Sequence, residues 1–251
     1  SKWIRGNLFI PDARMFWIKP SVKYLINYLN KNPVDLIITS GPPHSTHLIG
    51  LRLKQTIEIP WVADFRDPWS NIDFYQELKL SKWADKKHRD LEKKVLTNSD
   101  LVLTIGENLK NELIKLGGKN VQIVENGYDE DDFNEENINI DNEFTIAHIG
   151  SFTPSRNHIA LWQSLKELTL ENVEFKKQLK IKLIGKVDHS VYNSIRKFSL
   201  ESHILSLGYM SHNKVIKEQK KSKVLLLMVN NTPNAKGIIT GKIFEYIASG
   251  R

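Results

Sequence analysis

Two segments in the second half of the chain combine glycine, basic and acidic residues in patterns that suit a phosphate-bearing ligand. In the first, Gly150 directly follows an apolar run and Arg156 closes the segment 149–156. Glycine lets a ligand approach the backbone, and arginine can hold a diphosphate through two charge-assisted hydrogen bonds. An ordinary strand-to-helix loop with one surface arginine fits the same residues, so both interpretations stay open.

The second segment ends the chain. Thr240 and Gly241 mark the start of a helix with an apolar face, which places Lys242 in its first turn. The helix dipole makes a lysine there unfavourable unless an anion joins it. Glu245 lies on the same face, where its carboxylate can accept hydrogen bonds from ribose hydroxyls. The alternative is a simple surface pair of Lys242 and Glu245.

The elements that must position these residues are strands and helices in alternation. Short β-rich apolar runs separated by helical patterns indicate parallel sheets with crossover helices. The fold class is therefore α/β, with two Rossmann-like doubly wound domains. The expected strands cover residues 35–39, 60–64, 100–105, 121–124, 144–149, 180–184 and 223–229.

The boundary between the two domains is expected in an acidic, asparagine-rich stretch, 129–143, which is poor in apolar residues. This gives a first domain at 1–135 and a second at 136–251. The first shows about four strands and no leading strand with a glycine-rich turn, whereas such sheets usually have five or six. The chain stops where another strand is expected, so both domains are expected to be truncated.

The net charge of +7 and the pI near 9.3 favour an anionic partner, such as a phosphate-bearing small molecule, a membrane surface or a nucleic acid. The aromatic residues form no interleaved basic stripe, which argues against nucleic acid. The densest group of lysines is expected to be a solvated helix face. It comprises Lys214, Lys217, Lys220, Lys221 and Lys223.

The absence of cysteine excludes disulfides and thiolate metal sites and fits a reducing, intracellular compartment. No apolar run approaches the roughly 20 residues that cross a bilayer, and no signal peptide is apparent. We therefore expect a cytoplasmic protein, with peripheral contact at the inner face of the membrane as an option. Neither a metal ligand spacing nor a P-loop or nucleophile-elbow motif occurs, so no metal site and no cofactor is expected.

Four segments, in this order and spacing, resemble family 4 of the glycosyltransferases, which have two Rossmann-like domains in the GT-B fold and retain anomeric configuration. They are the strand, helix and Asn-Gly junction at 99–133, the phosphate loop at 149–156, the turn at 207–210 and the donor helix at 241–250. The likeness runs from about Pro33 to Arg251. The order of the four segments is more specific than any one of them.

The resemblance implies a nucleoside-diphosphate-sugar as the donor substrate. Gly150 and Arg156 match the phosphate loop, where Arg156 takes the place of the lysine that holds the diphosphate. Lys242 matches the lysine of the donor helix, and Glu245 the carboxylate that grips the ribose. The turn beside the nucleotide base is matched by Gly208 and Tyr209.

Two positions depart from the family's pattern. Ser151 stands where the loop usually has an arginine, and Gly237 stands where a glutamate usually lies near the donor sugar. Gly237 and Ile238 would then meet the sugar through their backbone N–H groups. The identity of the sugar is left open by this loss.

In the first domain, segment 63–69 resembles that of family members acting on lipid-linked or polysaccharide acceptors. It and segment 40–47 follow strands and are expected to face the cleft. Asp67, with His44 as a second candidate, would orient or deprotonate an acceptor hydroxyl.

Purely structural interpretations compete with these catalytic and binding roles. Asp64, Arg66 and Asp67 would also make a structural ion-pair cluster, and Trp69 either stacks on a sugar or packs inside the protein. The leading hypothesis is transfer of a sugar to a glycan or glycolipid hydroxyl in polysaccharide or cell-surface glycan synthesis. Its rivals are a non-catalytic scaffold of the same fold, which Ser151 and Gly237 favour, and a sugar-nucleotide epimerase, for which paired carboxylates and histidines are missing.

Overall fold

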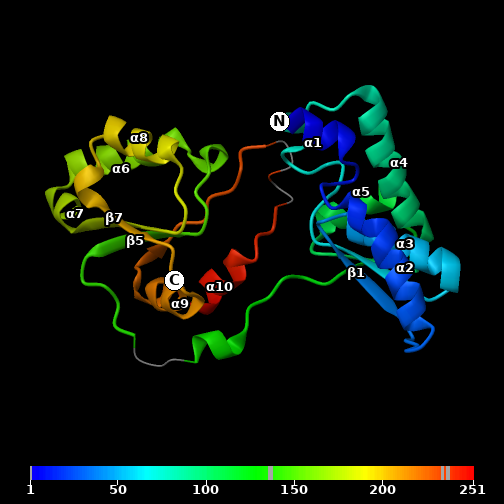
Figure 1. The fold of residues 1–251 in the computed structure, drawn as a ribbon. Coiled ribbons are helices and arrows are strands. Elements are labelled where there is room, and N and C mark those ends of the chain that lie inside the picture. The colour runs from blue at the N-terminus through cyan, green and yellow to red at the C-terminus, as the bar shows by residue number, and fades with distance from the viewer. Residues whose placement is uncertain (1, 135–137, 233–234, 236–237) are drawn as a thin grey trace. The chain divides into compact units, whose positions relative to one another are not determined.

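The computed structural model describes residues 2–134, 138–232, 235 and 238–251. The chain divides into two compact units, Ser1–Glu125 and Asn126–Arg251. Each unit contains one four-stranded sheet, and all paired strands are parallel (Figure 1). The expected α/β class with parallel sheets is confirmed.

The first unit has its strands in the order β1-β2-β3-β4. They are β1 (Ile37–Gly41), β2 (Trp61–Phe65), β3 (Leu101–Thr104) and β4 (Val121–Ile123). The helices are α1 (Lys2–Leu8), α2 (Ile18–Leu29), α3 (Ser45–Ile57), α4 (Lys82–Asn98) and α5 (Glu107–Lys115), with 3-10 turns at Met15–Trp17 and Tyr75–Leu78. Because the order rises steadily, right-handed crossovers place α3, α4 and α5 on one face of the sheet.

Side-chain burial along β2 shows where the core of the first unit lies. Trp61, Ala63 and Phe65 alternate onto one face and have no exposed surface. They join a cluster with residues of α3 and α4, including Leu51 and Val95. Since side chains alternate along a strand, this periodicity fixes which face of the sheet the helices cover.

The second unit has the strand order β7-β6-β5-β8. The strands are β5 (Phe144–Ile149), β6 (Leu179–Ile184), β7 (Ile204–Gly208) and β8 (Val224–Leu225). The helices are α6 (Ile159–Glu171), α7 (Val173–Gln178), α8 (His189–Lys197), α9 (His212–Lys221) and α10 (Lys242–Ala248), with 3-10 turns at Glu130–Phe133, Pro154–Arg156 and Glu201–His203. The order reverses at β5, and such a reversal creates the crevice in which open α/β sheets bind ligands.

The expected strand at 223–229 is wrong in extent, because only Val224 and Leu225 are assigned to β8. One further ladder bond runs from Leu226 N to Ala147 O, at 2.8 Å. Beyond it the residues alternate between two cores: Leu226 and Met228 pack against one cluster, and Leu225 and Leu227 against the other. The run is apolar because both of its sides are covered, and not because its backbone is paired throughout.

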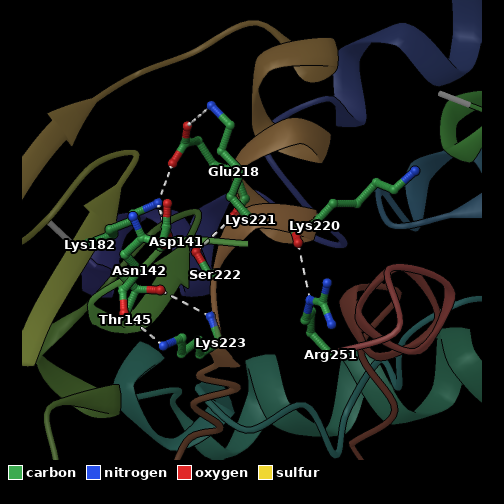
Figure 2. A network of polar contacts seen from close by, with 10 residues as sticks. All are labelled: Asp141, Asn142, Thr145, Lys182, Glu218, Lys220, Lys221, Ser222, Lys223 and Arg251. Carbon is green, nitrogen blue, oxygen red and sulfur yellow. Dashed lines mark hydrogen bonds and ion pairs between the residues drawn. The ribbon is translucent and has the colours of Figure 1, made fainter. Parts of the chain in front are cut away.

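A buried lysine joins three segments of the second unit. Lys182 of β6 has a side chain only 7% exposed, and its Nζ lies 2.7 Å from Asp141 and 2.6 Å from Glu218 of α9 (Figure 2). Burial alone would lower the pKa of Lys182, but the hydrogen bonds and charges of the two carboxylates outweigh it and raise the pKa. The ion pairs therefore tie α9 and the segment before β5 to the sheet.

The lysine group at 214–223, which lies on α9 and just after it, is only partly the solvated face that was expected. Lys214 is exposed. Lys220 Nζ, however, donates to Phe133 O at 3.1 Å. Lys223 Nζ donates to Asn142 O at 2.9 Å (Figure 2). Both contacts hold the chain that leads into β5. Lys223 is exposed as expected, whereas Lys220 is half-buried, so the expectation is wrong for Lys220.

Candidate active site

Three glycines form the carboxyl edge of the second sheet. Gly150, Gly185 and Gly208 lie at the ends of β5, β6 and β7, with φ of 98°, 107° and 67°, a region that favours glycine. Gly150 N donates to Ile184 O at 2.8 Å, and Gly185 N donates to Gly208 O at 2.7 Å. A Cβ on Gly185 would lie 2.7 Å from Gly150 O, so the turns are packed backbone to backbone.

Lys242 crosses the first of these turns. It is the first residue of α10, is half-buried, and its Nζ donates to Ile149 O at 2.6 Å. A Cβ on Gly150 would lie 2.4 Å from this Nζ. Gly150 is therefore needed for its positive φ, and a side chain at this position would displace the flexible end of Lys242 from the space that it occupies.

Arg156 approaches the same place from the end of the turn Pro154–Arg156. Its Nε donates to Asn230 Oδ1 at 3.3 Å and its Nη1 donates to Ser151 O at 3.4 Å. Burial lowers the pKa of Lys242, the positive charge of Arg156 lowers it further, and only Glu245 opposes the shift. Within the described part of the chain, neither Lys242 nor Arg156 forms a salt bridge, so two cations repel each other across a shared space.

A histidine beside them was not singled out from the sequence. His148 of β5 is 3% exposed, and neither ring nitrogen has a hydrogen-bond partner in the described residues. Burial, followed by the charges of Lys242 and Arg156, lowers its pKa to about 4. At neutral pH the ring is uncharged. A histidine near the carboxyl end of a mostly apolar strand was the available signal.

The remaining residues expected at the donor site differ in how exposed they are and in what they contact. Glu245 is half-buried, its Oε2 accepts from Gln219 Nε2 at 3.1 Å, and it lies close enough to Lys242 to affect its pKa. Ser151 is exposed and Ile238 half-buried. Tyr209 is 94% exposed and follows the glycine turn at Gly208.

The structure therefore brings Gly150, Ser151, Arg156 and Lys242 together. Glu245 lies one helical turn beyond Lys242, and Gly208 is connected to Gly150 through Gly185. Gly237, the position expected to meet the donor sugar, lies outside the described residues.

Both residues expected to be catalytic line one pocket in the first unit. The pocket has a volume of about 430 Å³, and His44 and Asp67 share its wall with proline and aromatic residues. His44 precedes α3 and Asp67 follows β2, so the carboxyl ends of two adjacent strands, β1 and β2, supply them.

His44 is held by stacking. Its ring lies 4.6 Å from that of Trp69 with an interplanar angle of 3°, and its Nδ1 is buried without a partner among the described residues. Burial lowers the pKa of His44 to about 4, with Asp12 opposing and His88 adding to the shift. Trp69 is 2% exposed and its Nε1 donates to His88 Nδ1 at 3.1 Å, so this tryptophan packs inside the protein.

Asp67 differs from its acidic neighbour. Asp64 accepts a hydrogen bond from Ser40 Oγ at 2.8 Å and lies 4.0 Å from Arg66 Nη1, so the structural ion pair exists for Asp64 and Arg66. The pKa of Asp67 is raised by desolvation at the pocket wall and by Asp73, against the opposing charge of Arg66, although the residue remains exposed. Asp67 is thus a stronger base than an ordinary aspartate, whereas His44 is a weaker base than an ordinary histidine.

Comparison with known families decides the assignment of the chain. The family model described as Glycosyltransferase Family 4 matches residues 3–132, just over half of the 251 residues. The chain belongs to this family. The resemblance found in the sequence is thereby confirmed, and the match covers the segment that contains His44 and Asp67.

Solved structures show that this Family 4 chain has the GT-B fold. Sucrose-phosphate synthase from Thermosynechococcus elongatus matches at 13% identity and a TM-score of 0.60, over 85% of this chain and 55% of that one. HepE of Anabaena, in complex with UDP and glucose, matches at 15% identity and a TM-score of 0.64. The match covers 92% of this chain and 61% of that one. TarM of S. aureus, in a complex that includes UDP, matches at 14% identity and a TM-score of 0.61. The match covers 92% of this chain and 43% of that one.

The Family 4 chain thus spans less than two thirds of each of these proteins. A comparison with curated protein sequences finds no match. In the part of the chain that the structure describes, no helix has the length and apolar character that crossing a membrane requires.

Proposed function

We propose that the chain carries the donor and acceptor sites of a retaining glycosyltransferase, which moves a sugar from a nucleoside-diphosphate-sugar to a hydroxyl of a glycan or glycolipid. The observation that carries the proposal is the mutual repulsion of Lys242 and Arg156 over the Gly150 turn. A diphosphate between the two cations would convert this repulsion into two charge-assisted interactions. Glu245 would accept the ribose hydroxyls.

The proposed chemistry needs no metal or cofactor. The bond between the sugar's anomeric carbon and the diphosphate oxygen breaks. A bond from that carbon to the acceptor oxygen forms on the face that the diphosphate leaves, so that the anomeric configuration is retained. Negative charge builds up on the leaving diphosphate, where Lys242 and Arg156 stabilise it. The proton of the acceptor hydroxyl passes to Asp67, whose raised pKa suits that role.

Uridine diphosphate is the first nucleotide to test. HepE and TarM were both crystallised with UDP, and both share the fold of this chain. The nucleotide base would lie near Gly208 and Tyr209, where the 94% exposed tyrosine ring offers a stacking surface.

A peripheral membrane contact at the cytoplasmic face is part of the proposal. Three aromatic residues of the first unit, Trp17, Tyr24 and Tyr28, are 58%, 66% and 48% exposed at or near α2. Lys19 and Lys23 of the same helix are also exposed. Exposed aromatic rings beside lysines suit the interface of an anionic bilayer, and this would bring the enzyme to a lipid-linked acceptor.

Calorimetry with UDP, GDP and ADP tests the donor site, and a donor-turnover assay tests the reaction. We expect one of the diphosphates to bind, and the corresponding nucleotide-sugar to be consumed with release of that diphosphate. Binding without turnover would support the non-catalytic scaffold. Ser151, in place of the loop arginine, favours that alternative. If none of the three diphosphates binds, both functions fail.

A further inference from the structure

We infer that the pocket of the first unit selects an acceptor that carries an oxyanion group, carboxylate or phosphate, and that Arg5 and Arg14 hold this group. Both arginines line the pocket that contains His44 and Asp67. The inference rests on the proposed function in treating the ligand of this pocket as the acceptor, and it adds the acceptor's charge.

The fold fixes Arg5 at the pocket through the neighbouring residues of α1. Asn7 Nδ2 donates to Lys79 O at 3.3 Å, and Asn7 Oδ1 accepts from Ser81 N at 2.7 Å. A Cβ on Gly6 would lie 2.6 Å from Leu80 Cδ2 and 3.3 Å from Leu78 O, so the helix passes close to this segment. The helix is thus anchored on the segment 78–81, and this anchoring determines the position of Arg5 at the pocket.

A tight turn at residues 12–14 fixes Arg14 at the same pocket. Asp12 Oδ1 accepts from Arg14 N at 2.9 Å, and Asp12 Oδ2 accepts from Ser45 N at 2.8 Å. The turn is thereby tied to the first residue of α3. The Arg14 guanidinium lies 5.1 Å from the ring centroid of Trp17, which supports its planar group from one side.

The charges of the pocket leave the two guanidinium groups available. The acidic lining residues are Asp12 and Asp67. Both oxygens of Asp12 already accept backbone N–H groups, and Asp67 is assigned to the acceptor hydroxyl. In the described part of the chain neither Arg5 nor Arg14 pairs with a carboxylate. Arginine is the side chain best suited to bind a planar or tetrahedral oxyanion with two hydrogen bonds.

The rest of the wall fits a sugar ring. Pro11, Pro42, Ile72 and Phe74 line the pocket, and they provide apolar surface for the C–H faces of a pyranose. This surface and the two arginines together describe a site for a sugar acid or a sugar phosphate.

An NMR titration without any nucleotide tests the inference. The probes are glucose, glucuronate, glucose 6-phosphate and inorganic phosphate. We expect glucuronate or glucose 6-phosphate to bind at least about tenfold more tightly than glucose and inorganic phosphate, since a hydrogen-bonded charge pair contributes about a factor of ten or more. The tighter of the two acids identifies the group as carboxylate or phosphate.

Matched variants locate the effect. Arg5→Gln and Arg14→Gln, singly and together, are expected to remove the preference for the acid, whereas Arg52→Gln, at an exposed arginine of α3 outside the pocket, should keep it. Circular dichroism melting confirms that each variant folds. Equal affinity for glucose and both acids, or a preference that survives in the double variant, overturns the inference.

A last measurement separates this inference from the proposed function. UDP affinity is determined for the same variants, because the donor residues lie in the other unit. If UDP binds and the acids show no preference over glucose, only the inference fails. If the acid preference depends on Arg5 and Arg14 but no nucleoside diphosphate binds, the inferred oxyanion site is supported and the proposed glycosyltransferase function is contradicted. Binding of inorganic phosphate as tightly as the preferred acid also overturns the inference, because the sugar then contributes nothing.

Discussion

The ammonium group of Lys242, at the first residue of α10, donates a 2.6 Å hydrogen bond to the carbonyl oxygen of Ile149 at the end of β5. The bond holds the cation above the Gly150 turn. We expect Lys242→Met to weaken the binding of UDP, or whichever diphosphate binds, by about 10- to 100-fold, because an interaction with a charged group is lost. Arg156→Gln should have an effect of similar size.

Calorimetry of single and double variants checks this prediction. Lys214→Met, at an exposed lysine of α9, is the matched control and should bind as the parent protein does. Because both cations would contact one diphosphate, the double variant should lose less affinity than the sum of the single losses in free energy. Unchanged affinity in Lys242→Met would remove this lysine from the donor site.

Gly150→Ala tests the turn itself. The new methyl group would lie 2.4 Å from Lys242 Nζ, and the residue would have to keep φ of 98°. We expect a loss of about 1–3 kcal/mol in the free energy of unfolding and weaker diphosphate binding, measured by urea denaturation and calorimetry. Gly127→Ala, where a Cβ meets nothing within 4 Å, is the control. A normal affinity in Gly150→Ala would show that Lys242 can move without consequence.

Buried histidines should make stability depend on pH. The pKa values of His44 and His148 are lowered by burial to about 4, from an ordinary 6.5. Below pH 6.5 the unfolded chain therefore takes up protons that the folded chain does not, so stability present above pH 6.5 is lost as the pH falls towards 4. Each histidine should contribute about 2 kcal/mol to the loss by pH 5.

Urea denaturation at pH 7 and pH 5 measures this dependence. His148→Leu should reduce the difference in unfolding free energy between the two pH values, because leucine does not titrate. His189→Gln, at an exposed histidine of α8, is the control and should leave the difference unchanged. An equal pH effect in parent and His148→Leu proteins would contradict the assignment of a lowered pKa to His148.

The ion pairs of Lys182 should be needed for the second unit to fold stably. Lys182→Met leaves Asp141 and Glu218 without their shared cation, and we expect a loss of about 3 kcal/mol, the low end for a buried pair because the carboxylates are partly exposed. Thermal or urea unfolding measures it. Adding Glu218→Gln should restore part of the stability. A loss that is simply additive would mean that the two residues act independently.

Asp67 and His44 can be separated kinetically. Asp67→Asn should lower turnover by about 100-fold or more while leaving UDP affinity unchanged, since a general base typically contributes that much. Turnover of the parent protein should fall as the pH drops through the raised pKa of Asp67, because the carboxylate must be ionised to accept a proton. A fully active Asp67→Asn variant would leave His44 as the candidate base.

Much of the fold follows from local sequence patterns, whereas the pocket does not. The apolar runs around Trp61 and Leu101 form the expected strands because their residues favour a buried, pleated backbone. Lys242 at the start of its helix was predictable because helix starts have local signals. Arg5 and Arg14 could not be recognised from the sequence, because their position depends on contacts with segments more than 30 residues away, through Asn7 to Lys79 and Asp12 to Ser45.

The mutual packing of Gly150, Gly185 and Gly208 has a practical consequence for engineering. Where three turns meet through main-chain atoms, no side chain is available to be altered, so mutagenesis at those positions can only damage the platform. Libraries aimed at a different base or sugar should therefore diversify Tyr209, which directly follows Gly208, and retain the glycines as constants.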